Sequence, residues 1–273
     1  MWMRMPGFAT YDQIINALTT GKGQLIFFQK ASITSVAAFW YRLWNAAGAP
    51  GPGVDPTPAL QGQIPARNIA GALAQNNPIA PATLHMISFG SGGGTLGSLM
   101  IYDRLLHVGG ISLTINSLQT FTGTLAPSRH SDGIGNQILV EITTATTATA
   151  ATLTVTYTNT LDQTKTATIT LAAAEPVNRC YFLNLAAGDL GVKTLVSCQL
   201  SAAKTAGVAN IALLNGAEIV VVPWVANQWT ERDLVLQMAN LPRVLNDACL
   251  TLMILASTTT TGIIFGRLQL AEN

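Results

Sequence analysis

Residues 152–171, TLTVTYTNTLDQTKTATITL, decide the fold class of this chain. Leu153, Val155 and Tyr157 alternate with threonines, so apolar and polar side chains point to opposite faces of an extended segment. Residues 159–164 supply a turn, and KTATITL continues with the same kind of residues. The stretch therefore predicts an antiparallel β-hairpin with one buried face.

Similar segments, rich in β-branched residues and alternating every second residue, recur over the second half of the chain. They cover residues 111–118, 137–143, 194–200, 217–225, 250–256 and a final strand at 263–270. Residues 143–152, TTATTATAAT, favour a loop or a polar-faced strand. The fold class predicted is mainly β: an antiparallel, jelly-roll-like β-sandwich.

The first 97 residues have a different texture. Thr10 and Gln13 form a capping pattern for a helix, and Pro and Gly break regular structure further on. The pattern predicts a helix at 11–20, a strand at 24–28, a second helix at 35–45, a Pro/Gly-rich arm at 47–68, a short helix within 70–84 and a flexible glycine loop at 88–97. We expect an N-terminal helical anchoring region at 1–48, an arm and linker at 49–97 and the sandwich at 98–273.

The chain is poor in charge. Only 10% of residues are charged, against roughly 25% in typical soluble proteins, and 49% are hydrophobic. Such a surface favours burial against other subunits, and the alternative is a neutral monomer. A net charge of +1 gives no general attraction to nucleic acid or to an anionic membrane, and no stretch of about 18 apolar residues occurs. We therefore expect no nucleic-acid or membrane partner.

Motifs that carry chemistry are sparse. The glycines of 90–97 lack the Lys-Ser/Thr ending of a phosphate loop. His85, His107 and His130 are too far apart in sequence to form a metal motif, and His107 is expected in a turn before Gly109. Residues 128–133, SRHSDG, indicate a polar loop, and Glu231 and Asp233 are an isolated carboxylate pair. Cys180, Cys198 and Cys249 have apolar neighbours, which indicates buried core positions. We expect no catalytic residue, metal or cofactor, and no enzymatic activity.

The tryptophans offer a candidate interface, because aromatic side chains are common anchors between subunits. The candidates are Trp2, Trp40, Trp44, Trp224 and Trp229, together with Asp103 and Arg104. Two alternatives stay open: the N-terminal tryptophans could form the core of a small helical unit, and Asp103 and Arg104 could fix the backbone where the arm enters the sheet.

Three segments carry a family resemblance. They are YDRLLHVGG at 102–110 followed by ISLTINSLQT, the segment 139–168 with an acid-containing strand and a TVTYTN hairpin, and LNLAAGDLGVKTLVSCQLSAAKTAGVANIALL at 183–214. Together they resemble structural proteins of tailed bacteriophages, over roughly residues 86–222. The resemblance implies a place in the virion and many copies, and it transfers no catalytic residue.

From these features we expect a capsid decoration or cement protein, assembled into the virion in the host cytoplasm. Its partners would be other virion proteins, above all the major capsid protein, and a homotrimer would suit a three-fold axis. The alternatives are a tail or baseplate component, or a receptor protein that binds glycans through Trp224 and Trp229.

Overall fold

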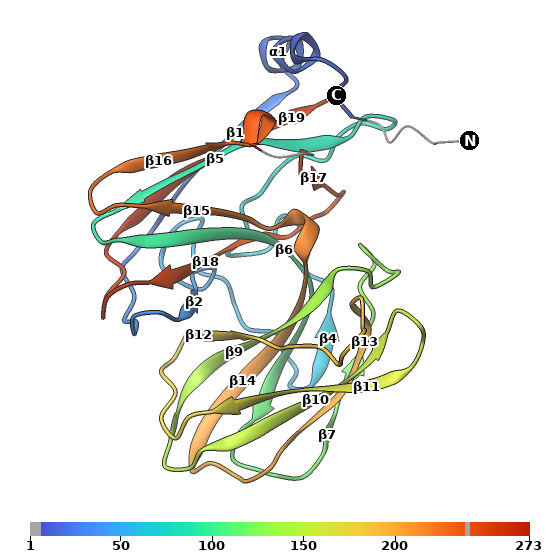
Figure 1. Cartoon of the computed structure of the whole chain (residues 1–273), viewed down its shortest axis with the longest axis vertical. Helices are drawn as coiled ribbons and strands as arrows, with labels where there is room; N and C mark the ends of the chain where they lie inside the picture. The colour runs from blue at the N-terminus through green and yellow to red at the C-terminus, as the bar shows by residue number, and fades with distance from the viewer. Residues whose placement is uncertain (1–6, 238–240) are drawn as a thin grey trace.

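The computed structural model describes residues 7–237 and 241–273. The chain is mainly β and its sheets are antiparallel, which confirms the predicted fold class; in the described residues only the short pairing of β4 with β8 is parallel. Three sheets are stacked along the long axis of the molecule (Figure 1). We call them the upper, central and lower sheets.

The upper sheet contains, in order, β16 (Trp229–Asp233), β5 (Leu84–Gly93), β19 (Ile264–Glu272), β1 (Gly23–Lys30) and β3 (Gly48–Ala49), with β17 (Arg243–Val244) paired to β5. The lower sheet contains β11 (Thr164–Leu171), β10 (Ala151–Asn159), β13 (Val192–Leu200) and β7 (Gln119–Thr120). The helical segments are α1 (Tyr11–Thr19), α2 (Leu234–Gln237) and the 3-10 turn η1 (Gly216–Glu218).

The central sheet contains β14 (Ala206–Asn215), β9 (Asn136–Thr147), β12 (Arg179–Phe182), β2 (Trp40–Arg42), β18 (Leu250–Ala256), β6 (Gly97–Ser112), β4 (Gln61–Gln63) and β8 (Thr122–Gly123), and β15 (Val220–Trp224) pairs with β6. Because β14 pairs with β6 as well as with β9, six of these strands close on themselves in the order β6, β14, β9, β12, β2 and β18. We call this closed circuit the ring.

The predicted hairpin is confirmed as β10 and β11. Leu153 pairs with Ile169 and Val155 with Ala167, and along β10 every second residue is buried. The inward residues pack against the central sheet, because Leu153, Val155 and Tyr157 share one core with residues of β6, β9 and β14. The alternation seen in the sequence therefore marks the face of the lower sheet that packs on the ring.

Two sandwiches result, one on each side of the ring. The upper sheet packs on β15, β18, β2 and the first half of β6 around one apolar core. The lower sheet packs on β9, β14 and the second half of β6 around another. The single 16-residue strand β6 thus runs through both sandwiches, as Figure 1 shows.

Of the glycines predicted as a flexible loop, Gly90, Gly92 and Gly93 belong to strand β5 and Gly97 begins β6, so the prediction holds only for a turn at residues 94–96. A Cβ at Gly90 would collide with the ring of Trp229, and one at Gly92 would lie 3.2 Å from Phe265 Cζ. From Gly93, a Cβ would lie 3.1 Å from the indole nitrogen of Trp224. The glycines therefore make room for aromatic rings on both faces of the strand.

The other predictions for the first 97 residues are confirmed in part. The helix at 11–20 is confirmed as α1, and the strand at 24–28 as β1. The helix predicted at 35–45 is wrong, because Trp40–Arg42 form strand β2 between β12 and β18. No helix forms within 70–84 either; those residues form turns and extended chain up to β5. The ring and the upper sheet draw strands from both sides of the boundaries predicted at residues 48 and 97.

Gly266 provides a test of the upper sandwich. A Cβ there would collide with the ring of buried Phe28 and with the carbonyl oxygen of Gly90. We expect Gly266→Ala to lower the free energy of unfolding by about 2–3 kcal/mol, because the added methyl group would overlap a backbone oxygen as well as an aromatic ring. The matched control is Gly94→Ala, whose Cβ meets nothing within 4 Å. Equal stability of the two variants in denaturant titrations would contradict the packing described.

Candidate functional site

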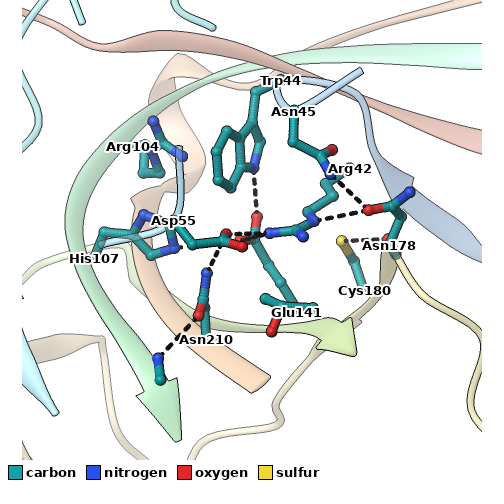
Figure 2. Close-up of polar contacts among 12 residues, drawn as sticks. Arg42, Trp44, Asn45, Asp55, Arg104, His107, Glu141, Asn178, Cys180 and Asn210 are labelled. Atoms are coloured by element: carbon teal, nitrogen blue, oxygen red, sulfur yellow. Dashed lines mark hydrogen bonds and ion pairs between the residues drawn. The ribbon is translucent and has the colours of Figure 1, made fainter. Parts of the chain in front are cut away.

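A cluster of charged and polar side chains fills one end of the ring interior, and apolar residues fill the other. The apolar end contains Met100, Tyr102, Leu139, Cys180, Ala212, Leu214 and Met253. The polar end, which we call the ring cluster, contains Arg42, Trp44, Arg104, His107 and Glu141, with Asp55, Asn178 and Asn210 at its edge (Figure 2).

Glu141, on β9, is the centre of the ring cluster and is fully buried. The indole nitrogen of Trp44 donates to Glu141 Oε1 at 2.9 Å, and His107 Nε2 and Arg42 Nη1 lie 3.3 and 3.7 Å from Oε2. Neither His107 Nε2 nor Oε2 has a hydrogen bond of good geometry, so that contact is mainly electrostatic. Burial raises the pKa of Glu141, but His107, Arg42 and Arg104 lower it more, to about 2.

Arg42, on β2, joins the ring to the arm. Its Nη1 lies 2.6 Å from Asp55 Oδ1, which also accepts from Asn210 Nδ2 at 2.7 Å. Its Nε donates to Asn178 Oδ1 at 3.0 Å, and Asn45 donates to the same oxygen. One guanidinium therefore bridges the arm, β9 and the segment before β12.

Arg104 and His107 reach the same side of β6 because the strand has a bulge. Leu106 pairs with Leu213 and Arg104 with Leu214, which leaves Leu105 as an extra residue. Trp44 contacts both side chains: the Arg104 guanidinium carbon is 4.2 Å from a ring centroid of Trp44, and the His107 ring meets the indole edge-on at 5.4 Å. Burial and the charge of Arg104 lower the pKa of His107.

The Pro/Gly-rich arm, predicted as a linker or extended arm, packs on its own chain. Gly62 and Gln63 of β4 pair with Val108 and His107. Glycines allow a close approach to Trp44: a Cβ on Gly53 would lie 2.5 Å from Trp44 Cε3, and one on Gly71, which has φ +86°, would collide with the Trp44 carbonyl. The Pro/Gly-rich segment, whose composition suggested a linker, therefore covers the ring cluster.

Asp103 and Arg104 point to opposite sides of β6. Asp103 accepts two hydrogen bonds from Arg129, at 2.7 and 2.9 Å, and one from the backbone of Cys249 at 2.7 Å. Arg129 belongs to the segment predicted as a polar loop, yet it is buried and also donates to the carbonyl of Pro65. The ion pair of Asp103 and Arg129 therefore links the end of the arm, at Pro65, to β6 and to Cys249, which precedes β18.

The structure separates the interface candidates. Trp44, Trp224, Asp103 and Arg104 are buried within the chain, and Trp40 is partly buried against Phe182. The indole nitrogen of Trp224 donates to the carbonyl of Thr95 at 2.7 Å. Trp229 is 44% exposed, and Trp2 lies outside the described residues. Of the candidates that the structure describes, Trp229 alone is exposed at the surface.

Trp229 belongs to an apolar patch on the outer face of the upper sheet. We define this sheet patch by Leu25 and Phe27 on β1, Phe265 on β19 and Trp229 on β16, which are 44–68% exposed. The rings of Trp229 and Phe265 are stacked, with centroids 6.0 Å apart and planes at 20°. Beside them Arg267 donates two hydrogen bonds to Glu231, at 2.8 and 3.0 Å. Glu231, one of the two carboxylates predicted as an isolated pair, is therefore bound by an arginine.

The histidines and cysteines occupy separate surroundings. His85 contacts Thr83 and Phe8, and His130 lies 3.1 Å from Glu218. His107 lies in strand β6, not in the turn predicted for it. All three cysteines are buried, as predicted. Across residues 7–237 and 241–273, no three His, Cys, Asp or Glu side chains gather as a metal site requires, and none of the described helices is long and apolar enough to cross a membrane.

The sequence singled out only part of the ring cluster. Arg42 lay within a predicted helix and Asp55 within a predicted linker. Outside the ring cluster, Arg129, which pairs with Asp103, lay within a predicted polar loop. Glu141 alone had a local signal. It is the one carboxylate in the apolar segment 138–142, in a chain of only 13 acidic residues. A lone carboxylate at such a position indicates a charge that must be paired inside the protein.

Comparison with known proteins adds little to this geometry. No family model matches the chain, and no curated protein does. Among solved structures, the VP2 subviral particle of infectious bursal disease virus aligns at 8% identity over 92% of this chain and 81% of that chain, with a TM-score of 0.16. The T=1 particles derived from the same virus align at 9% identity over 92% and 77%, with a TM-score of 0.18. Scores this low carry no inference about fold or function.

The lowered pKa of Glu141 predicts that the free energy of unfolding falls in acid. The folded pKa of Glu141, about 2, lies below the usual 4.5, so its contribution is complete above pH 4.5 and is lost as the pH falls toward 2. At about 1.4 kcal/mol per pKa unit, that contribution is about 3 kcal/mol. We expect Glu141→Gln to lower the free energy of unfolding at pH 7 by a similar amount and to flatten its decline below pH 4.5.

The measurement is urea unfolding at a series of pH values. Asp162→Asn is the control, because Asp162 forms an exposed ion pair with Lys193 and such pairs contribute less than about 1 kcal/mol. An unchanged acid limb in Glu141→Gln would show that this carboxylate does not control the acid response.

Proposed function

We propose that this chain is a non-enzymatic structural component of a virus particle, and specifically a decoration or cement protein on the capsid of a tailed bacteriophage. The sheet patch is the observation that carries the proposal. Phe27 is 68% exposed, and Phe265 and Trp229 are 47% and 44% exposed on the same sheet face. Exposed aromatic clusters of this kind are typical of protein contacts.

The low charge of the chain supports contact with other subunits. With 10% charged residues and a net charge of +1, the surface has little electrostatic repulsion to keep neighbours apart. Association through the sheet patch would depend on buried apolar area, which is how a cement protein stabilises a shell. The partner proposed is the major capsid protein, reached in the host cytoplasm during assembly.

The resemblance of residues 86–222 to tailed-phage structural proteins supports the more specific part of the proposal. A homotrimer would close identical contacts around a three-fold axis of the shell. Because the arm is packed over its own ring cluster, the proposed contact is the sheet patch. A tail or baseplate component is the structural alternative, with the same patch facing the tail.

One observation favours a second function, glycan binding. The stacked rings of Trp229 and Phe265 form an open aromatic platform beside the ion pair of Arg267 and Glu231, and sugar rings stack on such platforms. Trp224 is buried and takes no part. A glycan array probed with the full chain tests this function, and absence of any signal removes it.

The copy number of the chain in intact particles tests the capsid proposal. We expect a ratio of one chain per few capsid subunits, because a cement protein occupies repeated positions of the shell. Quantitative mass spectrometry of purified particles against the major capsid protein measures the ratio. A ratio far below this value would place the chain in the tail, and its absence from particles would overturn both structural proposals.

Substitution within the sheet patch tests the contact itself. We expect Phe27→Asp to weaken binding to expanded capsids roughly tenfold or more, because a charge would be buried at an apolar contact. The control is Leu161→Asp, a 72% exposed residue in the β10–β11 turn. Co-sedimentation with expanded capsids gives both affinities, and equal binding of wild type and Phe27→Asp would exclude the sheet patch as the docking face.

A further inference from the structure

A cavity of about 310 Å³ lies where the arm covers the ring cluster. Its walls come from arm segments 54–57 and 63–65 and from Ile69, and β6 contributes Arg104 and His107. Val54 and Ile69 are at least partly exposed, whereas Arg104 and His107 are buried. The cavity therefore leads from the surface of the arm to charged groups inside the ring, a position typical of ligand sites in barrels.

Arg104 has donors without acceptors. The residue is 1% exposed, its Nη2 contacts only the weak acceptor Cys249 Sγ at 3.7 Å, and its Nε and Nη1 have no hydrogen-bond partner. In the described part of the chain no carboxylate lies within ion-pair distance of Arg104. The carboxylate of Glu141 lies within that distance of Arg42 and His107 instead. A buried guanidinium left in this state is costly, which indicates a missing acceptor.

The surroundings define that acceptor. The guanidinium needs oxygen atoms with negative charge, whereas the walls formed by Pro56, Ile64, Pro65 and Ile69 need an apolar body. A phosphate, which carries up to two negative charges, fits poorly, because the carboxylate of Asp55 also lines the cavity. A singly charged carboxylate on a short aliphatic chain satisfies both requirements.

We propose that this cavity is a binding site for an aliphatic carboxylate, whose charge the Arg104 guanidinium at the buried end of the cavity balances while the hydrocarbon part packs against Ile64 and Ile69. The carboxylate has two possible sources with the same chemistry: a free small acid, or an acidic group of another polypeptide that inserts beneath the arm. The proposal does not depend on the capsid function or on the sheet patch.

The experiment is calorimetric titration of the full chain at constant ionic strength, with chloride as the reference anion. Butyrate and glutarate probe the free acid. The blocked peptides acetyl-Gly-Glu-Gly-amide and acetyl-Gly-Gln-Gly-amide probe a carboxylate borne by a polypeptide. We expect saturable binding of at least one carboxylate, no binding of the Gln peptide, and a rise in Tm with each ligand that binds.

Two variants locate the site. Arg104→Met removes the guanidinium and should weaken carboxylate binding roughly tenfold or more. Ile69→Trp fills the cavity from its partly exposed wall while keeping Arg104, so it tests occupancy even where Arg104→Met loses stability. The control is Arg267→Met, which removes a surface arginine paired with Glu231 and should leave binding unchanged.

The outcomes separate the sources. Binding of butyrate or glutarate without the Glu peptide indicates a free acid, and binding of the Glu peptide indicates a polypeptide partner. The proposal is overturned if no carboxylate binds saturably, in which case water fills the cavity. It is equally overturned if Ile69→Trp, correctly folded by circular dichroism, binds the carboxylates as well as wild type.

Discussion

The buried charge of Glu141 is the constraint on which the rest of the structure depends. A carboxylate with no exposure must be matched by positive or donating groups, and these arrive from three other parts of the chain: Arg42 of β2, Trp44 of the following segment and His107 of β6. In the ring, β12 separates β2 from β9, so the cluster reaches across the interior. The closed circuit of strands and the pairing of Glu141 therefore require each other.

The same charge fixes the register of β9. Ile138, Val140 and Ile142 face the core shared with the lower sheet, whereas Leu139 and Glu141 face the ring interior. A slip of one residue would place the carboxylate in the apolar core and the isoleucines against Arg42. Buried ion pairs contribute little net stability compared with apolar packing, but they penalise such alternatives strongly. The bulge at Leu105 serves the same arrangement, since it brings Arg104 and His107 to one side of β6.

Local patterns predicted the elements whose signal is local. The hairpin 151–171, the strand at 250–256 and helix α1 follow from alternation or capping, and the structure has them where the sequence placed them. Patterns failed where tertiary contacts decide. The glycines of β5 are required by aromatic rings from β15, β16 and β19, and the arm is ordered by Trp44. The ring cluster was predicted only in part, because its partners come together through the closure of the ring and share no sequence motif.

The interior of the ring and the arm are both committed to the chain itself, and this limits where partners can act. Trp44, Gly53 and Gly71 hold the arm against the cluster, so releasing the arm would expose Arg42 and Arg104 and separate Asp55 from Arg42. An intact chain therefore offers two distinct surfaces: the aromatic face of the upper sheet, and the cavity beneath the arm. They lie on different elements and differ in chemistry, because one is apolar and the other is built around the buried guanidinium of Arg104. Substitutions at Phe27 and at Arg104 therefore test the two surfaces separately.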